Sequence, residues 1–231
     1  MSPTLDVDAV LFDLDGTLAD TAGDLADALN RVRADRGQPP VPVEALRSHA
    51  SAGARGLLAA GMGLTPDDPE YPAARDAFLA HYAEGLAVTT RLFEGVDAML
   101  DAIEARGLAW GIVTNKAERY TGPVVLALGL AHRAGTIVSG DTTPHAKPHP
   151  APLLHAASAL RLPPWRCAYV GDDLRDVEAG NAAGMPTLVA HWGYLGNGVP
   201  PSAWPANGWL DAPRDLVGWL RRGRPNRQIP I

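Results

Sequence analysis

The sequence predicts an α/β fold: a doubly wound, mostly parallel sheet, interrupted after its first strand by an all-helical insert. Three features of the sequence predict it. A short apolar run near the N-terminus, Val10-Leu11-Phe12, has the pattern of a fully buried strand. Residues from about 20 to 90 show helical patterns and no strand pattern. From Arg91 onward, apolar strand-like runs alternate with helical segments, which implies right-handed β-α-β crossovers.

These patterns divide the chain into two parts. We expect a core made of residues 1–19 and 91–231 and a helical insert of residues 20–90. Within the insert, helical spacing of apolar residues predicts helices at 20–36, 44–60 and 71–86. The further elements predicted in the core are strands at 108–113, 136–139, 167–170 and 187–190 and helices at 95–106, 118–129, 150–161 and 174–183. The arginine-rich tail at 221–227 has the composition of a solvated end.

Composition excludes several classes of protein. With 231 residues, 46% of them hydrophobic, the chain can bury a sizeable core. The net charge of −6 argues against general nucleic-acid binding, which needs a basic surface. The single cysteine, Cys167, excludes an internal disulfide and a cysteine-based metal cage. Asp6 and Asp8 occupy the N-terminus and no long apolar segment follows, so we expect no membrane span and a cytoplasmic location.

The first predicted strand runs directly into a pair of acids, Asp13 and Asp15. Side chains alternate along a strand, so residues two apart point the same way and these carboxylates should converge. Gly16 allows the chain to turn sharply beyond them. A single Asp before Gly is common in ordinary turns, but two carboxylates after a buried strand favour a functional site.

Two other predicted strands also end in polar groups. The strand at 108–113 is followed by Thr114-Asn115-Lys116, and the strand at 167–170 by Gly171 and the acids Asp172, Asp173 and Asp176. In open α/β sheets the ligand site lies at the carboxyl ends of the strands. Polar strand ends are common singly, but three of them in this topology predict one site.

The residues at these ends suit a phosphate and a metal. The Thr114 hydroxyl, with the amides of Asn115 and Lys116 at the start of the next helix, would form an anion site; capping of that helix by Thr114 is compatible with this role. Pro148 keeps Lys147 extended and so aims its side chain, although a lone lysine is usually solvated. The acidic cluster at 172–176 needs a cation, and all-oxygen ligation points to Mg²⁺.

Together these motifs resemble those of the haloacid dehalogenase superfamily, in its Mg²⁺-dependent phosphatase branch. The resemblance implies a Rossmann-like core and a helical cap where residues 20–90 are inserted. It implies that Asp13 is the nucleophile, which forms an aspartyl-phosphate, and that Asp15 is the general acid and base. A dehalogenase would not need the second carboxylate, so Asp15 counts against that activity.

The resemblance also implies how the other residues bind phosphate and metal. Thr114, Asn115 and Lys147 would hold the phosphoryl oxygens. Asp13, the backbone carbonyl of Asp15, and Asp172 would hold Mg²⁺. Thr17, Asp173 and Asp176 would support the site, with Asp176 acting through water or Lys147. Many members have Ser or Thr where Asp173 stands, so this acid adds charge near the metal.

Within the superfamily, the chain to about residue 220 resembles phosphoglycolate phosphatase-like proteins, and segments such as Trp192-Gly193-Tyr194 look most like the N-acetylmuramic acid 6-phosphate phosphatase branch. In the cap, the Gly-bracketed Arg55 suits a carboxylate on the leaving group, although it equally fits a solvated loop. The expected partner is a small phosphorylated metabolite, and the candidates are N-acetylmuramic acid 6-phosphate and 2-phosphoglycolate. The protein itself is expected to be a monomer or a homodimer. A phosphomutase and a non-enzymatic phospho-receiver domain are the alternatives.

Overall fold

The main sheet confirms the predicted doubly wound parallel architecture. The computed structural model describes residues 4–196 and 198–220. Its six-stranded sheet has the order β5-β4-β1-β6-β7-β8, and all neighbouring strands are parallel. The strands are β1 (Ala9–Phe12), β4 (Ala109–Val113), β5 (Thr136–Val138), β6 (Cys167–Gly171), β7 (Thr187–Ala190) and β8 (Gly208–Leu210). The chain adds strands on one side of β1 and then on the other, so the strand order reverses there.

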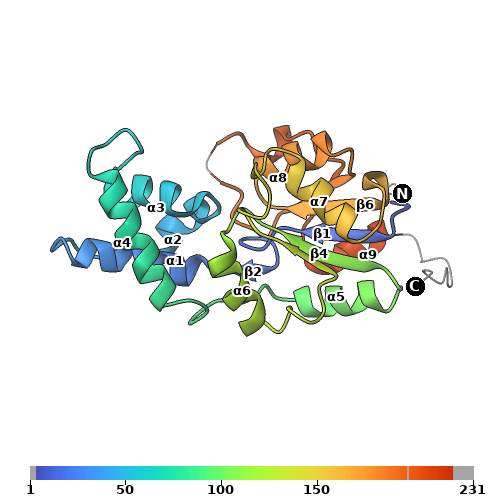
Figure 1. Cartoon of the computed structure of the whole chain (residues 1–231), viewed down its shortest axis with the longest axis horizontal. Helices are drawn as coiled ribbons and strands as arrows, with labels where there is room; N and C mark the ends of the chain where they lie inside the picture. The colour runs from blue at the N-terminus through green and yellow to red at the C-terminus, as the bar shows by residue number, and fades with distance from the viewer. Residues whose placement is uncertain (1–3, 197, 221–231) are drawn as a thin grey trace.

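Helices cover both faces of this sheet (Figure 1). Because strand side chains alternate, Val10 and Phe12 pack with the buried residues of α5, α6 and α9, whereas Ala9 and Leu11 pack with those of α7 and α8. The helices of this part are α5 (Val96–Glu104), α6 (Glu118–Ala127), α7 (Ala151–Ala159), α8 (Leu174–Ala182), α9 (Leu216–Trp219) and the short 3-10 turns η2 (Pro164–Arg166), η3 (Pro201–Ala203) and η4 (Pro213–Asp215).

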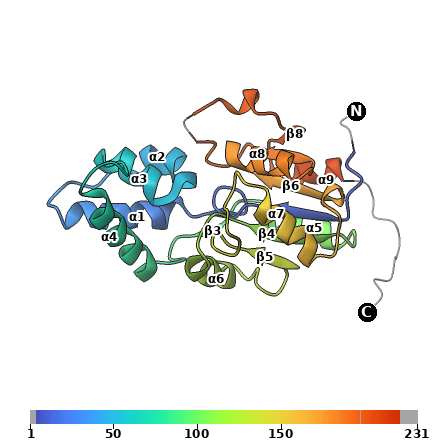
Figure 2. The ribbon, with the colours of Figure 1, turned by 45° about the horizontal axis from the view of Figure 1, so that its top comes forward.

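The inserted helices form a second unit, called the cap below, at one end of the molecule (Figures 1 and 2). They are α1 (Ala22–Ala34), α2 (Val43–Leu46), the 3-10 helix η1 (Arg47–Ala52), α3 (Gly53–Met62) and α4 (Tyr71–Glu84). They share an apolar cluster around Leu29, Leu57 and Phe78, which Tyr120 and Tyr194 of the core join at its edge. The two crossings between cap and sheet pair as the antiparallel strands β2 (Ala19–Asp20) and β3 (Arg91–Leu92). These separate clusters support the division into 1–19 with 91–231 and 20–90, which we propose.

Two details differ from the sequence prediction. The helix predicted at 44–60 is broken into α2, η1 and α3, because the chain turns at Gly53, whose φ is +56°. Strands β2, β3 and β8 were not predicted: the first two have only two residues each, and in β8 Gly208 and Trp209, which is 40% exposed, interrupt the apolar run that marks a buried strand. The basic tail at 221–227 lies outside the described residues. Within 4–196 and 198–220, no helix has the length and apolar character needed to cross a membrane.

Candidate active site

The carboxyl ends of the three central strands meet at one edge of the sheet. β1 lies between β4 and β6 and is parallel to both. The residue directly after each strand is Asp13, Thr114 or Asp172, and these three therefore lie at the same edge. The Asp13 amide donates to the carbonyl of Val170 at 2.9 Å, which extends the pairing of β1 with β6 by one residue. This edge is also the point where the strand order reverses, the usual ligand position in open α/β sheets.

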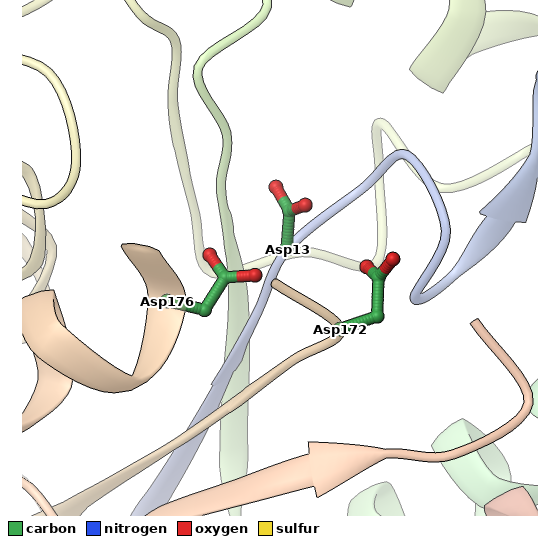
Figure 3. A group of neighbouring side chains, drawn as sticks. All are labelled: Asp13, Asp172 and Asp176. Atoms are coloured by element: carbon green, nitrogen blue, oxygen red, sulfur yellow. The ribbon is translucent and has the colours of Figure 1, made fainter. Parts of the chain in front are cut away.

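Three buried carboxylates face one another here (Figure 3). Asp13, Asp172 and Asp176 each offer an oxygen, and these oxygens lie within 4.8 Å of one another. Burial raises the pKa of Asp13 to about 7, against the opposing effect of Lys147, and raises the pKa of Asp172 well above its usual range. Buried anions this close repel one another unless a cation lies between them. The all-oxygen donor set therefore fits a hard divalent cation.

Asp172 is held in place from all sides. The Thr17 hydroxyl donates to its Oδ1 at 2.7 Å, and the Tyr194 amide donates to its Oδ2 at 2.9 Å. From the cap, the Ser51 hydroxyl donates to Oδ2 at 3.2 Å. Two glycines leave the space for this residue, since a Cβ at either would collide with it: Gly16, with a φ of +89°, and Gly193. Asp172 is therefore fixed before any ligand binds.

Lys147 is the cation at the centre of the acidic group. Its Nζ has four oxygens within hydrogen-bond distance for its three N–H donors: Asp13 Oδ1 at 2.9 Å, Asp176 Oδ1 at 2.7 Å, the Tyr169 hydroxyl at 2.7 Å and the Val113 carbonyl at 2.9 Å. Burial opposes its charge, but the two carboxylates outweigh burial and raise the pKa of Lys147. The lysine therefore stays charged next to Asp13, where it can bind a phosphoryl oxygen.

The Asn115 side chain has a role that was not predicted, while the predicted role of its backbone amide in binding phosphate stays a prediction. Its side chain makes two hydrogen bonds of 2.9 Å with the backbone of Lys147, so it holds the lysine loop in place. The next helix starts at Glu118, where its predicted range of 118–129 begins, so the amides of Asn115 and Lys116 do not open it as expected. Instead, the Lys116 amide donates to Thr114 Oγ1 at 3.2 Å.

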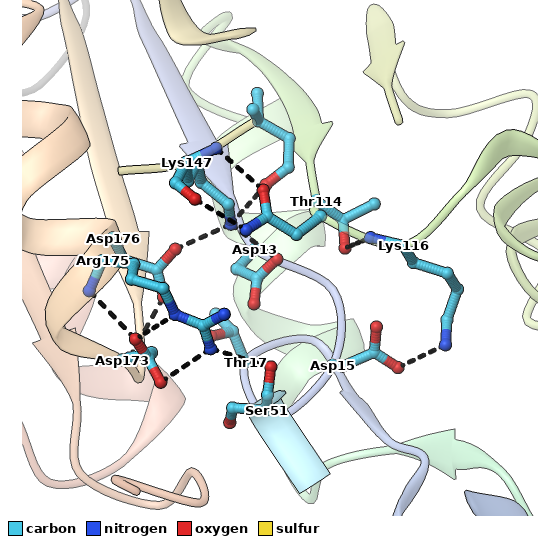
Figure 4. A network of polar contacts seen from close by, with 12 residues as sticks. Asp13, Asp15, Thr17, Ser51, Thr114, Lys116, Lys147, Asp173, Arg175 and Asp176 are labelled. Atoms are coloured by element: carbon cyan, nitrogen blue, oxygen red, sulfur yellow. Dashed lines mark hydrogen bonds and ion pairs between the residues drawn. The ribbon is translucent and has the colours of Figure 1, made fainter. Parts of the chain in front are cut away.

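Asp15 lies outside the acidic trio and has its own partners (Figure 4). The Thr21 hydroxyl donates to its Oδ1 at 2.6 Å, and Lys116 Nζ lies 3.0 Å from the same oxygen. The Lys116 side chain, which the sequence reasoning missed, also donates to the hydroxyl of Tyr82 on cap helix α4 at 2.9 Å. The second predicted catalytic carboxylate is thus bound by a cation that also contacts the cap.

Asp173 begins helix α8 and connects to the cap. Its side chain accepts from the Arg175 amide at 2.9 Å, while Asp176 Oδ2 accepts from the Asp173 amide at 3.1 Å, which completes a capping box. The Arg175 guanidinium binds both oxygens of Asp173, at 2.8 and 3.0 Å, and donates to the Ser51 carbonyl at 2.8 Å. The acid that departs from the family pattern therefore orients an arginine that holds the cap.

A cavity of ≈420 Å³ lies between these groups and the cap. Asp13, Asp15, Thr114 and Lys147 line one side, and Arg55 of α3 lines the other. Thr17 and Asp172 do not line it. The aromatic residues of the lining are Tyr71, Phe78, Tyr82 and Tyr120. A phosphate ester placed here would have two carboxylates and two lysines near its reacting end and an apolar wall near the other.

Comparison with known proteins identifies the family. Residues 7–184 match the model of haloacid dehalogenase-like hydrolases. The chain is 44% identical over 214 residues to the N-acetylmuramic acid 6-phosphate phosphatase of Pseudomonas aeruginosa, covering 93% of this chain and 95% of that protein. It is 40% identical over 208 residues to the Pseudomonas putida protein of the same name (90% and 93% covered). It is 41% identical over 212 residues to a phosphoglycolate phosphatase of Xylella fastidiosa, covering 90% of each.

Solved structures agree with this assignment. A predicted phosphoglycolate phosphatase from Haemophilus somnus superposes with a TM-score of 0.79 at 26% identity, covering 92% of this chain and 97% of that one. A putative phosphoglycolate phosphatase from Lactobacillus delbrueckii has the same fold, with a TM-score of 0.81 at 22% identity and coverage of 94% and 99%. The resemblance seen in the sequence is confirmed: the chain belongs to the haloacid dehalogenase-like hydrolases and is a phosphoric monoester hydrolase.

Proposed function

We propose that this phosphatase hydrolyses N-acetylmuramic acid 6-phosphate, a reaction of cell-wall recycling. The observation that supports this most is the cavity of ≈420 Å³, which is lined by four aromatic residues, by Asp13 of the core and by Arg55 of the cap. This volume is in the range of pockets that bind small organic ligands. Aromatic side chains suit the apolar face of a sugar ring, and an arginine suits the carboxylate of the lactyl group. The two Pseudomonas relatives have this activity in their names.

The proposed mechanism has two steps. In the first, an oxygen of Asp13 attacks phosphorus, the bond from phosphorus to the sugar oxygen breaks, and Asp15 gives that oxygen a proton. In the second, water attacks the phosphorus of the aspartyl-phosphate, the bond from phosphorus to the Asp13 oxygen breaks, and Asp15 takes up a proton of the water. Inorganic phosphate and the free carboxylate of Asp13 are the products. Thr114 and Lys147 hold the phosphoryl oxygens during both steps.

A Mg²⁺ ion is part of this proposal. Asp13, Asp172 and the backbone carbonyl of Asp15 would hold it, and Asp176 would support the group through its ion pair with Lys147 of 2.7 Å. When bound, the ion neutralises negative charge on the phosphoryl group. The fit of the site to a cation comes from the three buried carboxylates described above.

Phosphoglycolate phosphatase is the second candidate. The Xylella relative has that name, and Arg55 would also suit the carboxylate of 2-phosphoglycolate. That substrate has only two carbons, so it would leave the aromatic wall of the cavity without a partner. A phosphomutase would be recognised by a phosphorylated product isomer; the family match sets the non-enzymatic receiver domain aside. A cytoplasmic location and a monomeric or homodimeric state stay predictions.

The test is to measure kcat/KM for both compounds with Mg²⁺ on the same preparation. The proposal predicts a preference of at least about a hundredfold for the amino sugar phosphate, or about 2.7 kcal/mol of differential transition-state binding. A preference for 2-phosphoglycolate would overturn the substrate assignment and leave the phosphatase chemistry in place.

A further inference from the structure

The lysines of this chain are distributed in an unusual way. Of its 20 lysines and arginines only two are lysines, Lys116 and Lys147. Both have buried side chains, 7% and 3% exposed, and each is paired with one of the two proposed catalytic acids. Lys147 lies 2.9 Å from Asp13, and Lys116 lies 3.0 Å from Asp15. A lysine provides a compact point charge on a flexible stem, which an arginine cannot replace in a closely packed site.

The contacts of Asp15 are one-sided. Lys116 Nζ and the Thr21 hydroxyl both bind Oδ1, at 3.0 and 2.6 Å. Within the described residues, no hydrogen bond or ion pair involves Oδ2. Asp15 also lines the cavity. The two donors on Oδ1 fix the orientation of the carboxyl group. When Asp15 is protonated, the proton therefore lies on Oδ2.

Lys116 also connects Asp15 to the cap. Its Nζ donates to the Tyr82 hydroxyl at 2.9 Å and lies 4.7 Å from the centre of the Tyr82 ring. Tyr82 is itself buried, on a helix of the cap, and its ring packs against Tyr120 of the core helix α6 at 5.4 Å. A cap that moved away would remove one hydrogen bond and one cation–π contact from the lysine that holds Asp15.

We propose that Lys116 is a positioning residue for proton transfer by Asp15, and that Tyr82 makes this positioning depend on the closed cap. This inference rests on the proposed function, because it takes Asp15 as the general acid. In the first step the proton moves from Asp15 Oδ2 to the sugar oxygen as its bond to phosphorus breaks. Asp15 Oδ1 stays bonded to Lys116 and Thr21 throughout, so the group does not have to rotate.

The experiment compares two esters that differ in their need for a proton. The alkoxide of N-acetylmuramic acid leaves only with a proton, whereas p-nitrophenolate leaves without one. The measured quantity is kcat/KM, because it includes no step after the leaving group departs. We expect Lys116→Met to lose about a hundredfold on the sugar ester and less than about threefold on p-nitrophenyl phosphate. Tyr82→Phe, which removes one hydroxyl, should lose less kcat/KM than Lys116→Met, and its loss should again be larger on the sugar ester than on p-nitrophenyl phosphate.

The controls are the melting temperature of each variant, the milder variant Tyr82→Phe and the reference variant Asp15→Asn. Melting temperatures identify an unfolded variant, and Tyr82→Phe still tests the inference if Lys116→Met fails to fold. Equal losses on both esters, or no loss on either, would overturn the role of Lys116. Asp15→Asn is the reference: if it shows the ester pattern and Lys116→Met does not, only this inference fails. If Asp15→Asn itself shows no such pattern, the general-acid assignment in the proposed function fails.

Discussion

The two sides of the cavity differ in how firmly their side chains are held. On the core side, Asp13, Asp172 and Lys147 are buried and bonded to one another or to neighbouring backbone. On the cap side, Arg55 and Arg75 are exposed, and among the described residues Arg75 forms an ion pair only with its exposed neighbour Asp76, at 3.6 Å. Fixed groups suit a reaction that is the same for every phosphate ester, and adaptable groups suit the part of the substrate that varies.

The largest expected effect is on the fixed side. Asp13→Asn removes the nucleophile with almost no change of shape, so we expect kcat to fall by at least about a thousandfold on every ester. The fold should persist, since Asn has nearly the same shape as Asp and burial disfavours the charged form of Asp13, raising its pKa to about 7. Substantial residual turnover in this variant, measured with p-nitrophenyl phosphate, would contradict the assignment.

A second change loosens the fixed side without touching a reacting group. A Cβ at Gly193 would collide with Asp172 and with the Gly16 carbonyl, so Gly193→Ala should displace the carboxylate. We expect about a tenfold to hundredfold loss of Mg²⁺ affinity, measured by calorimetry, with a matching loss of activity. Gly122→Ala is the matched control, because nothing lies within 4 Å of its Cβ. Unchanged Mg²⁺ affinity in Gly193→Ala would mean that Mg²⁺ binding does not depend on the present position of the Asp172 carboxylate.

On the adaptable side the effect should depend on the substrate. Arg55→Ala removes one charge-assisted contact, which is worth about a tenfold increase in KM for an ester that has a carboxylate. For p-nitrophenyl phosphate, which has no carboxylate, we expect little change in KM. An equal increase for both esters, measured by steady-state kinetics, would show that Arg55 does not recognise the leaving group.

The smallest effect is expected at the linker between the two sides. Asp24 of α1 accepts hydrogen bonds from the amides and hydroxyls of Thr89 and Thr90, on the segment that returns to the core. Burial opposes its charge, but these hydrogen bonds outweigh burial and lower the pKa of Asp24. Asp24→Asn should therefore lower the free energy of unfolding by about 2 kcal/mol at neutral pH.

The pH dependence of that difference follows from the direction of the shift. A lowered pKa in the folded state stabilises the protein above the pKa of the unfolded chain, about 3.9. The stabilisation is lost as the pH falls through the lower folded pKa. The gap between wild type and Asp24→Asn, from urea unfolding, should thus be constant near neutrality and shrink below about pH 4. A difference in unfolding free energy that grows as the pH falls would contradict the lowered pKa of Asp24 in the folded protein.

The parallel sheet could be predicted because its signals are local. Val10 to Phe12 form a continuous apolar run, and the acids and hydroxyls follow the strands directly at Asp13, Thr114 and Asp172. A general rule of sheet topology then brings those ends together. The structure places the predicted core residues around one edge, whereas β8 was missed because Gly208 and the exposed Trp209 interrupt its apolar run.

The contacts across the cavity could not be predicted, because they depend on how the cap packs against the sheet. Lys116 meets Tyr82, and Arg175 meets Ser51, over separations of 34 and 124 residues. Nothing local to any of these residues indicates its partner. The hydrogen bonds between the Asn115 side chain and the backbone of Lys147 could not be predicted for the same reason, because the two residues are 32 positions apart.

The most direct test of the division between a fixed reactive side and an adaptable side is to trap the phosphoryl group. Asp15→Asn should still transfer it from p-nitrophenyl phosphate, which needs no proton, and then hydrolyse the intermediate slowly. After an acid quench, peptide mass spectrometry should find one phosphoryl group on Asp13, also when Arg55→Ala is added. A phosphoryl group on another residue, or product formation with no phosphorylated peptide at any time, would contradict this account of the core.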